Sequence, residues 1–150
     1  PIPAAERKNL IDAYNRRLFS GNLMEETRFG RTWANWENAL ASVQNEGPIG
    51  ESPAEYARAF SRLENHYFQN GGFLQTDGWI LRERHRIEHI PATIVQGRYD
   101  MICPPVSAWK LADGWDNCAL RMVAMAGHAL SEPGISAELV QVMDGLKLLA

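Results

Sequence analysis

Two residues suited to nucleophilic catalysis, Asp100 and His128, each follow a short predicted strand. Asp100 comes just after the run ATIVQ at 92–96, and His128 comes just after the run ALRMVAM at 119–125. Because the carboxyl ends of parallel strands meet at one edge of a sheet, we expect the two side chains to lie close together. A carboxylate can hold an imidazole in the tautomer that accepts a nucleophile's proton. The pattern therefore suggests the acid and histidine of a catalytic triad, although an isolated Asp and His at strand ends are more often structural.

The nucleophile of such a triad is not evident in the sequence. An α/β-hydrolase places its serine before the acid and the histidine, on a sharp G-x-S-x-G turn between a strand and a helix. None of the seven serines has that context: Ser20, Ser42, Ser52, Ser61, Ser107, Ser131 and Ser136. The sequence also lacks a glycine-rich segment for oxyanion-hole amides, and two strands are too few for a stable covered sheet. We therefore expect the chain to be the C-terminal part of something longer, or one half of a two-part assembly, and inactive alone.

Two glutamates, Glu37 and Glu64, occupy equivalent places on two predicted amphipathic helices. Each directly follows the third member of an apolar series spaced i, i+4, i+7, i+11; the two series are Phe29, Trp33, Trp36, Leu40 and Tyr56, Phe60, Leu63, Tyr67. At 100° per residue, each carboxylate lies about 60° from the centre of its apolar stripe. They could line a pocket between helices, but the pattern alone favours boundary glutamates that reach into solvent.

The segment HRIEH, from His85 to His89, matches the H-x-x-E-H pattern of one class of zinc proteases. That pattern requires both histidines on one face of a stable helix and a third ligand from elsewhere. Pro91 ends any helix two residues later, and Ile87 and Ile90 are typical of the approach to a buried strand. We therefore predict no metal site.

These candidates must be positioned by two different kinds of structure. In the first half, helices are predicted at 3–19, after the break at 20–22, and from 53 to the glycines at 71–72. In the second half, the predicted order is a strand at 92–96, a helix at 105–113, a strand at 119–125 and a final amphipathic helix. Strand, helix, strand, helix is the order of an α/β fold with a right-handed crossover.

The composition excludes several classes of protein. With 15 basic against 18 acidic residues and a net charge of −3, the chain lacks the basic excess of a nucleic-acid-binding surface or a polybasic membrane patch. No apolar run reaches the roughly 18 residues of a spanning helix, and the polar N-terminus has no signal-peptide core. Two cysteines, Cys103 and Cys118, are too few for a disulfide framework. We expect a cytoplasmic protein with reduced thiols.

Four motifs, in order along the chain, carry a family resemblance: WANWE, RLENHYF, IPATIVQGRYDMICP and AGHALSEPG. Together they resemble the proline iminopeptidase family of α/β-hydrolases over nearly the whole chain. The resemblance implies that residues 1–85 are the latter part of a helical cap. It also implies that residues 86–150 are the last two parallel strands and helices of the hydrolase domain.

The resemblance also implies an activity and a set of site residues. Asp100 and His128 match the family's catalytic acid and histidine, while Glu37 and Glu64 match the cap glutamates that hold the substrate's α-amino group. Where the family usually has the tripeptide Gly-His-Ser, this sequence has Gly127-His128-Ala129. The implied reaction is release of N-terminal proline from peptides by a serine peptidase without a cofactor. The implied partners are a peptide substrate and the N-terminal part of the same domain. The alternative is a non-catalytic binding module derived from a hydrolase cap.

Overall fold

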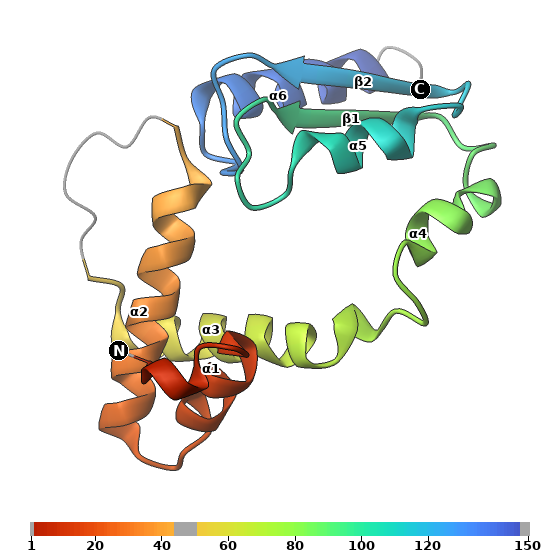
Figure 1. The fold of residues 1–150 in the computed structure, drawn as a ribbon. Helices are drawn as coiled ribbons and strands as arrows, with labels where there is room; N and C mark the ends of the chain where they lie inside the picture. The colour runs from red at the N-terminus through yellow and green to blue at the C-terminus, as the bar shows by residue number, and fades with distance from the viewer. Residues whose placement is uncertain (1, 44–50, 148–150) are drawn as a thin grey trace. The chain divides into compact units, whose positions relative to one another are not determined.

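The computed structural model of the chain describes residues 2–43 and 51–147, which form two compact units. The first unit comprises Pro1–Asn38 and Pro48–Gln75, and the second comprises Ala39–Gly47 and Thr76–Ala150. Helices make up the described part of the first unit, whereas the second contains strands as well (Figure 1). The predicted division at residue 85 refers to the family's cap and hydrolase domain, and it stays a prediction.

The first unit begins with a short 3-10 helix rather than with the long helix predicted at 3–19. The 3-10 helix η1 spans Ala4–Glu6, and helix α1 spans Leu10–Leu18. Asn9 separates them because its side chain accepts a hydrogen bond from the Asp12 amide and so caps α1. The carboxylate of Glu6 forms ion pairs with the guanidinium groups of Arg16 and Arg17 on α1, with N···O distances of 2.7 Å and 2.9 Å. The prediction of one continuous helix was therefore wrong.

Two longer helices, α2 (Leu23–Ala41) and α3 (Ala54–Gln69), make the framework of this unit. The side chain of Asn22 accepts hydrogen bonds from the amides of Met24 and Glu25 and so caps the N-terminus of α2. The apolar core is formed by Ile2, Ala13, Leu18, Phe29 and Trp33. Tyr14 of α1 packs edge-on against the rings of both Phe29 and Trp33.

The contact between α2 and α3 is made by small residues. A Cβ atom on Gly30 would lie 3.1 Å from the carbonyl oxygen of Ala57 and 3.2 Å from the hydroxyl of Ser61. Such a close approach leaves no room for bulky side chains between the helices. The buried residues of α3 are accordingly Ala57, Ser61 and Asn65. Asn65 lies in the interior because its amide group bonds Asn15 and the backbone carbonyl of Ile11.

The predicted aromatic stripes were therefore only partly correct. Phe29 and Trp33 are buried as expected, but 66% of Trp36 is exposed. On α3, Phe60 is half-buried, whereas Tyr56, Leu63 and Tyr67 are exposed. The buried face of α2 follows Glu26, Phe29, Gly30, Trp33 and Ala34. Glu37 follows Phe29 by eight residues and Trp33 by four, so it lies near this inward face, and its side chain is half-buried.

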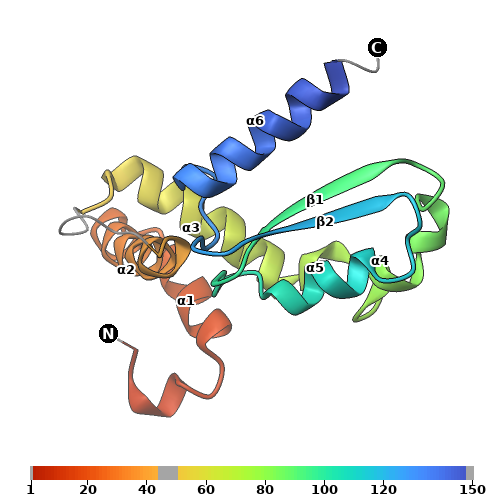
Figure 2. The same cartoon turned by 90° about the horizontal axis from the view of Figure 1, so that it is seen from above.

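The second unit contains a parallel pair of strands, β1 (Ala92–Gly97) and β2 (Cys118–Val123). They lie side by side in both views (Figures 1 and 2), in a register that opposes Ala92 to Cys118 and Gly97 to Val123. Helix α5 (Pro105–Ala112) connects them, and α6 (Pro133–Lys147) follows β2. The short helices α4 (Trp79–Arg82) and η3 (Arg84–Arg86) precede β1. The predicted order of strand, helix, strand and helix, which is that of an α/β fold, is confirmed.

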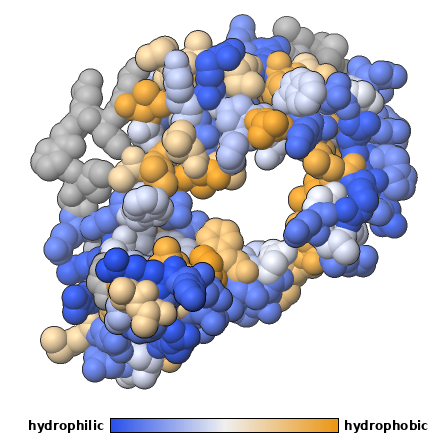
Figure 3. Space-filling model, in the orientation of Figure 1, coloured by the Kyte–Doolittle hydropathy of each residue, from blue (hydrophilic) through white to orange (hydrophobic). Residues whose placement is uncertain are grey.

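Large apolar side chains reach the surface in both units (Figure 3). In the first unit they include Trp36, Leu63, Phe68 and Phe73, and in the second Trp109, Leu130 and Met143. Across the described segments, no helix combines the length and the apolar character needed to cross a membrane.

The Glu6 ion pairs predict a specific dependence of stability on pH. Hydrogen bonds from Arg17 and then Arg16 lower the pKa of Glu6 from 4.5 to about 2. A carboxyl group whose pKa is depressed by folding contributes stability above its unfolded pKa, and that contribution is lost as pH falls from 4.5 towards 2. We expect the melting temperature of the protein to fall more steeply over this interval than that of the Glu6→Gln variant. Glu55→Gln, on the exposed start of α3, controls for loss of one charge. Parallel curves for wild type and Glu6→Gln would contradict the assignment.

Candidate active site

The structure brings Asp100 and His128 together at the carboxyl end of the strand pair. The Nδ1 atom of His128 lies 3.1 Å from Oδ2 of Asp100. The Asp100 side chain is 7% exposed and the His128 side chain 41%. The carboxylate is thus enclosed, whereas the imidazole remains accessible to a reacting group.

The turn after β1 satisfies the Asp100 carboxylate almost entirely through local contacts. Oδ1 accepts hydrogen bonds from the amides of Ile102 (3.0 Å) and Cys103 (2.7 Å). Oδ2 accepts one from the side-chain amide of Gln96, at 3.2 Å, besides the contact with His128. A buried carboxylate persists only when its lone pairs have such partners. The four contacts fix the orientation in which Asp100 faces the imidazole.

The end of β1 lies directly against the segment that carries His128. The amide of Tyr99 donates to the carbonyl oxygen of Ala126 at 2.9 Å. A Cβ atom at position 97 would lie 2.0 Å from the carbonyl oxygen of Gly127 and 2.6 Å from that of Ala126. Only glycine therefore fits at position 97, and this close approach sets the separation of the two site residues.

The His128 segment is also held by residues outside β1. The carbonyl oxygen of Ala41, at the end of α2, accepts hydrogen bonds from the amides of His128 (2.7 Å) and Ala129 (2.8 Å). The carboxylate of Glu132 accepts one from the amide of Gly127 at 3.0 Å. Sequence reasoning missed Ala41 and Glu132. A backbone acceptor leaves no signature in the residue type, and a glutamate just before a helix is normally exposed.

This geometry suits the acid and base functions of a triad. An ionised carboxylate can only accept a hydrogen bond, so its contact with Nδ1 places the imidazole proton on that nitrogen. The lone pair of Nε2 is then available to take a proton from an attacking hydroxyl group. The arrangement can orient a base and stabilise the imidazolium that forms, but it supplies no attacking atom.

The two predicted substrate-binding residues lie in the first unit, on neighbouring helices. Oε2 of Glu64 accepts a hydrogen bond of 2.7 Å from the indole nitrogen of Trp33. Trp33 and Glu37 are four residues apart on α2, and residues with that spacing are neighbours on one helix face. Both glutamates are half-buried. The indole contact thus ties Glu64 to the part of α2 that carries Glu37, and pattern reasoning did not anticipate it.

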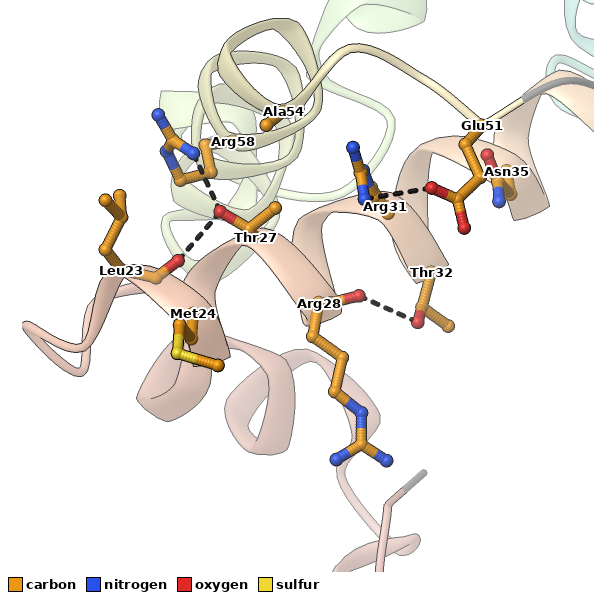
Figure 4. Close-up of a pocket in the computed structure, with 10 residues that line it drawn as sticks. All are labelled: Leu23, Met24, Thr27, Arg28, Arg31, Thr32, Asn35, Glu51, Ala54 and Arg58. Atoms are coloured by element: carbon orange, nitrogen blue, oxygen red, sulfur yellow. Dashed lines mark hydrogen bonds and ion pairs between the residues drawn. The ribbon is translucent and has the colours of Figure 1, made fainter.

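A groove between α2 and the start of α3 is a separate feature of the first unit. Three arginines line it, Arg28, Arg31 and Arg58, together with Glu51 and the hydroxyls of Thr27 and Thr32 (Figure 4). Arg58 donates to the hydroxyl of Thr27, and Arg31 pairs with Glu51. Neither Glu37 nor Glu64 is among its lining residues.

The HRIEH segment does not form the helix that a zinc site of this pattern requires. Residues 84–86 form a 3-10 helix, and turns follow at 87–89. Within residues 2–43 and 51–147, no three His, Cys, Asp or Glu side chains are arranged to hold a metal ion.

The close approach at Gly97 predicts the effect of adding one methyl group. In a Gly97→Ala variant the Cβ atom would overlap two backbone carbonyl groups, so the β1 end or the His128 segment must move. We expect a loss of about 1–3 kcal/mol or more in unfolding free energy, measured by chemical denaturation. Gly145→Ala in α6 is the matched control, because a Cβ atom there meets nothing within 4 Å. Equal stabilities for the two variants would disprove the constraint at position 97.

Curated proteins from different organisms that are similar to this chain carry the same name. The chain is 43% identical over 151 residues to a proline iminopeptidase of Arabidopsis thaliana, an alignment that covers 99% of this chain and 40% of the relative. It is 40% identical over 146 residues to proline iminopeptidases of Xanthomonas citri and Neisseria gonorrhoeae. These alignments cover 96% and 97% of this chain and 47% and 46% of the relatives. No protein-family model matches the sequence.

The chain thus spans less than half the length of these curated relatives, and the part it matches is C-terminal. A match to the C-terminal part agrees with the observed fold, in which helices precede two parallel strands that are followed by Asp100 and His128. Over nearly its entire length, the chain is homologous to the C-terminal part of the proline iminopeptidases.

Proposed function

We propose that this chain is the part of a serine aminopeptidase that supplies the catalytic acid, the catalytic histidine and the amine-binding glutamates. The observation that carries the proposal is the contact between His128 Nδ1 and the enclosed Asp100 carboxylate. The reaction is release of N-terminal proline from a peptide. The nucleophile and the oxyanion-hole amides come from the part of the relatives' length that this chain does not match.

His128 acts as general base and then as general acid in this mechanism. Its Nε2 takes the proton of the serine hydroxyl as that oxygen attacks the prolyl carbonyl carbon, and later returns a proton to the leaving amine. In deacylation the same nitrogen activates a water molecule. Asp100 stays ionised throughout and stabilises the imidazolium. Its four hydrogen-bonding contacts hold it in position, so no reorganisation is needed when charge develops.

Glu37 and Glu64 account for the requirement for an unblocked N-terminus. An N-terminal proline is a secondary ammonium with two N–H donors, which two carboxylates can satisfy by charge-assisted hydrogen bonds. The indole of Trp33 takes one lone-pair direction of Glu64, so the amine uses the others. A blocked or internal proline presents no ammonium group to these carboxylates, and it would be rejected for that reason.

The alternative is a binding module that retained the cap and lost the chemistry. It is favoured only by the absence of a serine elbow in the sequence. The complete protein distinguishes the two: a binding module would retain proline peptides without turning them over.

The isolated 150-residue chain is expected to show no hydrolysis of a proline arylamide above background. His128 and Asp100 can move and orient a proton, but the attacking oxygen comes from elsewhere. The measurement is release of the arylamine, with the complete protein as positive control. Turnover by the isolated chain that is abolished in His128→Ala would contradict this division of the site.

The two glutamates predict a substrate-dependent loss of activity in the complete enzyme. Glu37→Gln or Glu64→Gln removes a negative charge while nearly preserving shape. Removing one partner of a buried charge pair costs about 2–5 kcal/mol, or roughly 30- to several-thousand-fold in kcat/KM for a proline arylamide. Much of the loss should appear in KM, because the ammonium contact exists in both ground and transition states.

An aryl ester without an amine is the matched substrate for this experiment, and Glu55→Gln on α3 is the matched variant. The ester should be far less affected, because the serine chemistry is unchanged. Equal losses on the two substrates would exclude amine recognition by these residues.

A further inference from the structure

Glu132 is a buried carboxylate that the proposed chemistry does not use. Its residue is only 4% exposed, although it lies between a turn and the start of α6. A charged side chain in such a position normally faces solvent, and burying it is unfavourable unless every oxygen is well partnered. The contacts of Glu132 therefore indicate what it does.

Each oxygen of Glu132 accepts a hydrogen bond from a backbone amide. Oε2 takes the amide of Gly127 at 3.0 Å, and Oε1 takes the amide of Val43 at 2.7 Å. Gly127 directly precedes His128, while Val43 follows the end of α2. The carboxylate thus joins two backbone segments that are far apart in sequence, and both segments belong to the second unit.

The same two segments meet a second time through Ala41, whose carbonyl oxygen accepts the amides of His128 and Ala129. Three consecutive amides, those of residues 127–129, therefore find acceptors outside their own segment. A Cβ atom on Gly127 would lie 2.9 Å from the Ala41 oxygen and 3.2 Å from Oε1 of Glu132. The backbone that carries the imidazole is consequently held at three consecutive residues.

We propose that Glu132 is a positioning residue for His128, in addition to any contribution it makes to folding. The carboxylate fixes the backbone at Gly127, and through it the placement of Nδ1 against Asp100. Only a carboxylate can accept both amides: a glutamine would accept one and present an N–H group to the other. The inference rests on the proposed function, because it assigns Glu132 to the catalytic histidine of that reaction.

The test is Glu132→Gln in the complete enzyme, assayed on a proline arylamide and on an aryl ester without an amine. A displaced imidazole serves both substrates poorly, so we expect kcat to fall by roughly 10- to 100-fold on both, with KM changed by less than about threefold. This differs from the glutamate variants of the first unit, which should affect the arylamide selectively. Glu138→Gln is the matched control on α6, because it removes only an ion pair with Arg121.

A second measurement separates positioning from simple stabilisation. If Glu132 acts through the Asp100–His128 pair, Glu132→Gln should cost less than about threefold in an Asp100→Asn background, because interacting residues are non-additive. Rates are referred to the concentration of sites titrated with a serine-reactive phosphonate. Additive losses, or wild-type kcat per titrated site, would overturn the proposal and leave Glu132 a structural residue.

Two further readouts keep the outcomes distinguishable. If Glu132→Gln does not fold, Glu132→Asp keeps both acceptors on a shorter side chain and should give an intermediate loss in kcat. The proton shared by His128 and Asp100 can also be followed by NMR in ¹⁵N-histidine-labelled protein, with His128→Gln to assign it. An unchanged NMR signal in Glu132→Gln would overturn the proposed positioning role of Glu132, whether or not the wild type cleaves proline arylamides. Failure of the wild type to cleave proline arylamides would contradict the proposed function and not the positioning role.

Discussion

The burial of the Asp100 carboxylate is the constraint on which the candidate site depends. A carboxylate that is 7% exposed needs hydrogen-bond donors, and the structure provides them from both strand ends. The backbone turn after β1 donates two amides, Gln96 donates one side-chain amide, and His128 supplies the fourth contact. The histidine is therefore part of what makes the burial of Asp100 possible, and the charge of Asp100 in turn determines the tautomer of His128.

Other buried carboxylates show the same principle. Glu26 is buried on α2, where it accepts the amide of Gly21 at 3.0 Å and pairs with Arg62 at 2.7 Å. It thus joins the start of α2 to α3. Glu132 joins the His128 segment to the end of α2. In each case one charged side chain satisfies at least one backbone amide at a turn, where no regular secondary structure could do so.

Sequence patterns predicted the second unit well because its signals are local. A β-branched run that ends in glycine gave β1, and the turn after it gave the position of Asp100. The apolar stripes of the first unit misled for a physical reason. Close contact at Gly30 selects small partners, so Ala57, Ser61 and Asn65 are buried while Leu63 lies outside. Neither Gly30 nor Asn65 has an apolar side chain, and the polar contacts that bury Asn65 come from distant residues of α1.

The Asp100–His128 pair and the two glutamates that we propose to bind the amine are held by different kinds of interaction. Asp100 and His128 are fixed by backbone hydrogen bonds and by the absence of a Cβ atom at Gly97, so their geometry tolerates little change in main-chain path. Glu64 is fixed by one side-chain contact, the indole of Trp33, on a helix surface. A side chain on a helix can be exchanged without moving the main chain, whereas a strand-end turn cannot be altered so simply. Under the proposed function, substrate preference can therefore change on α2 and α3 while the geometry of the Asp100–His128 pair stays the same.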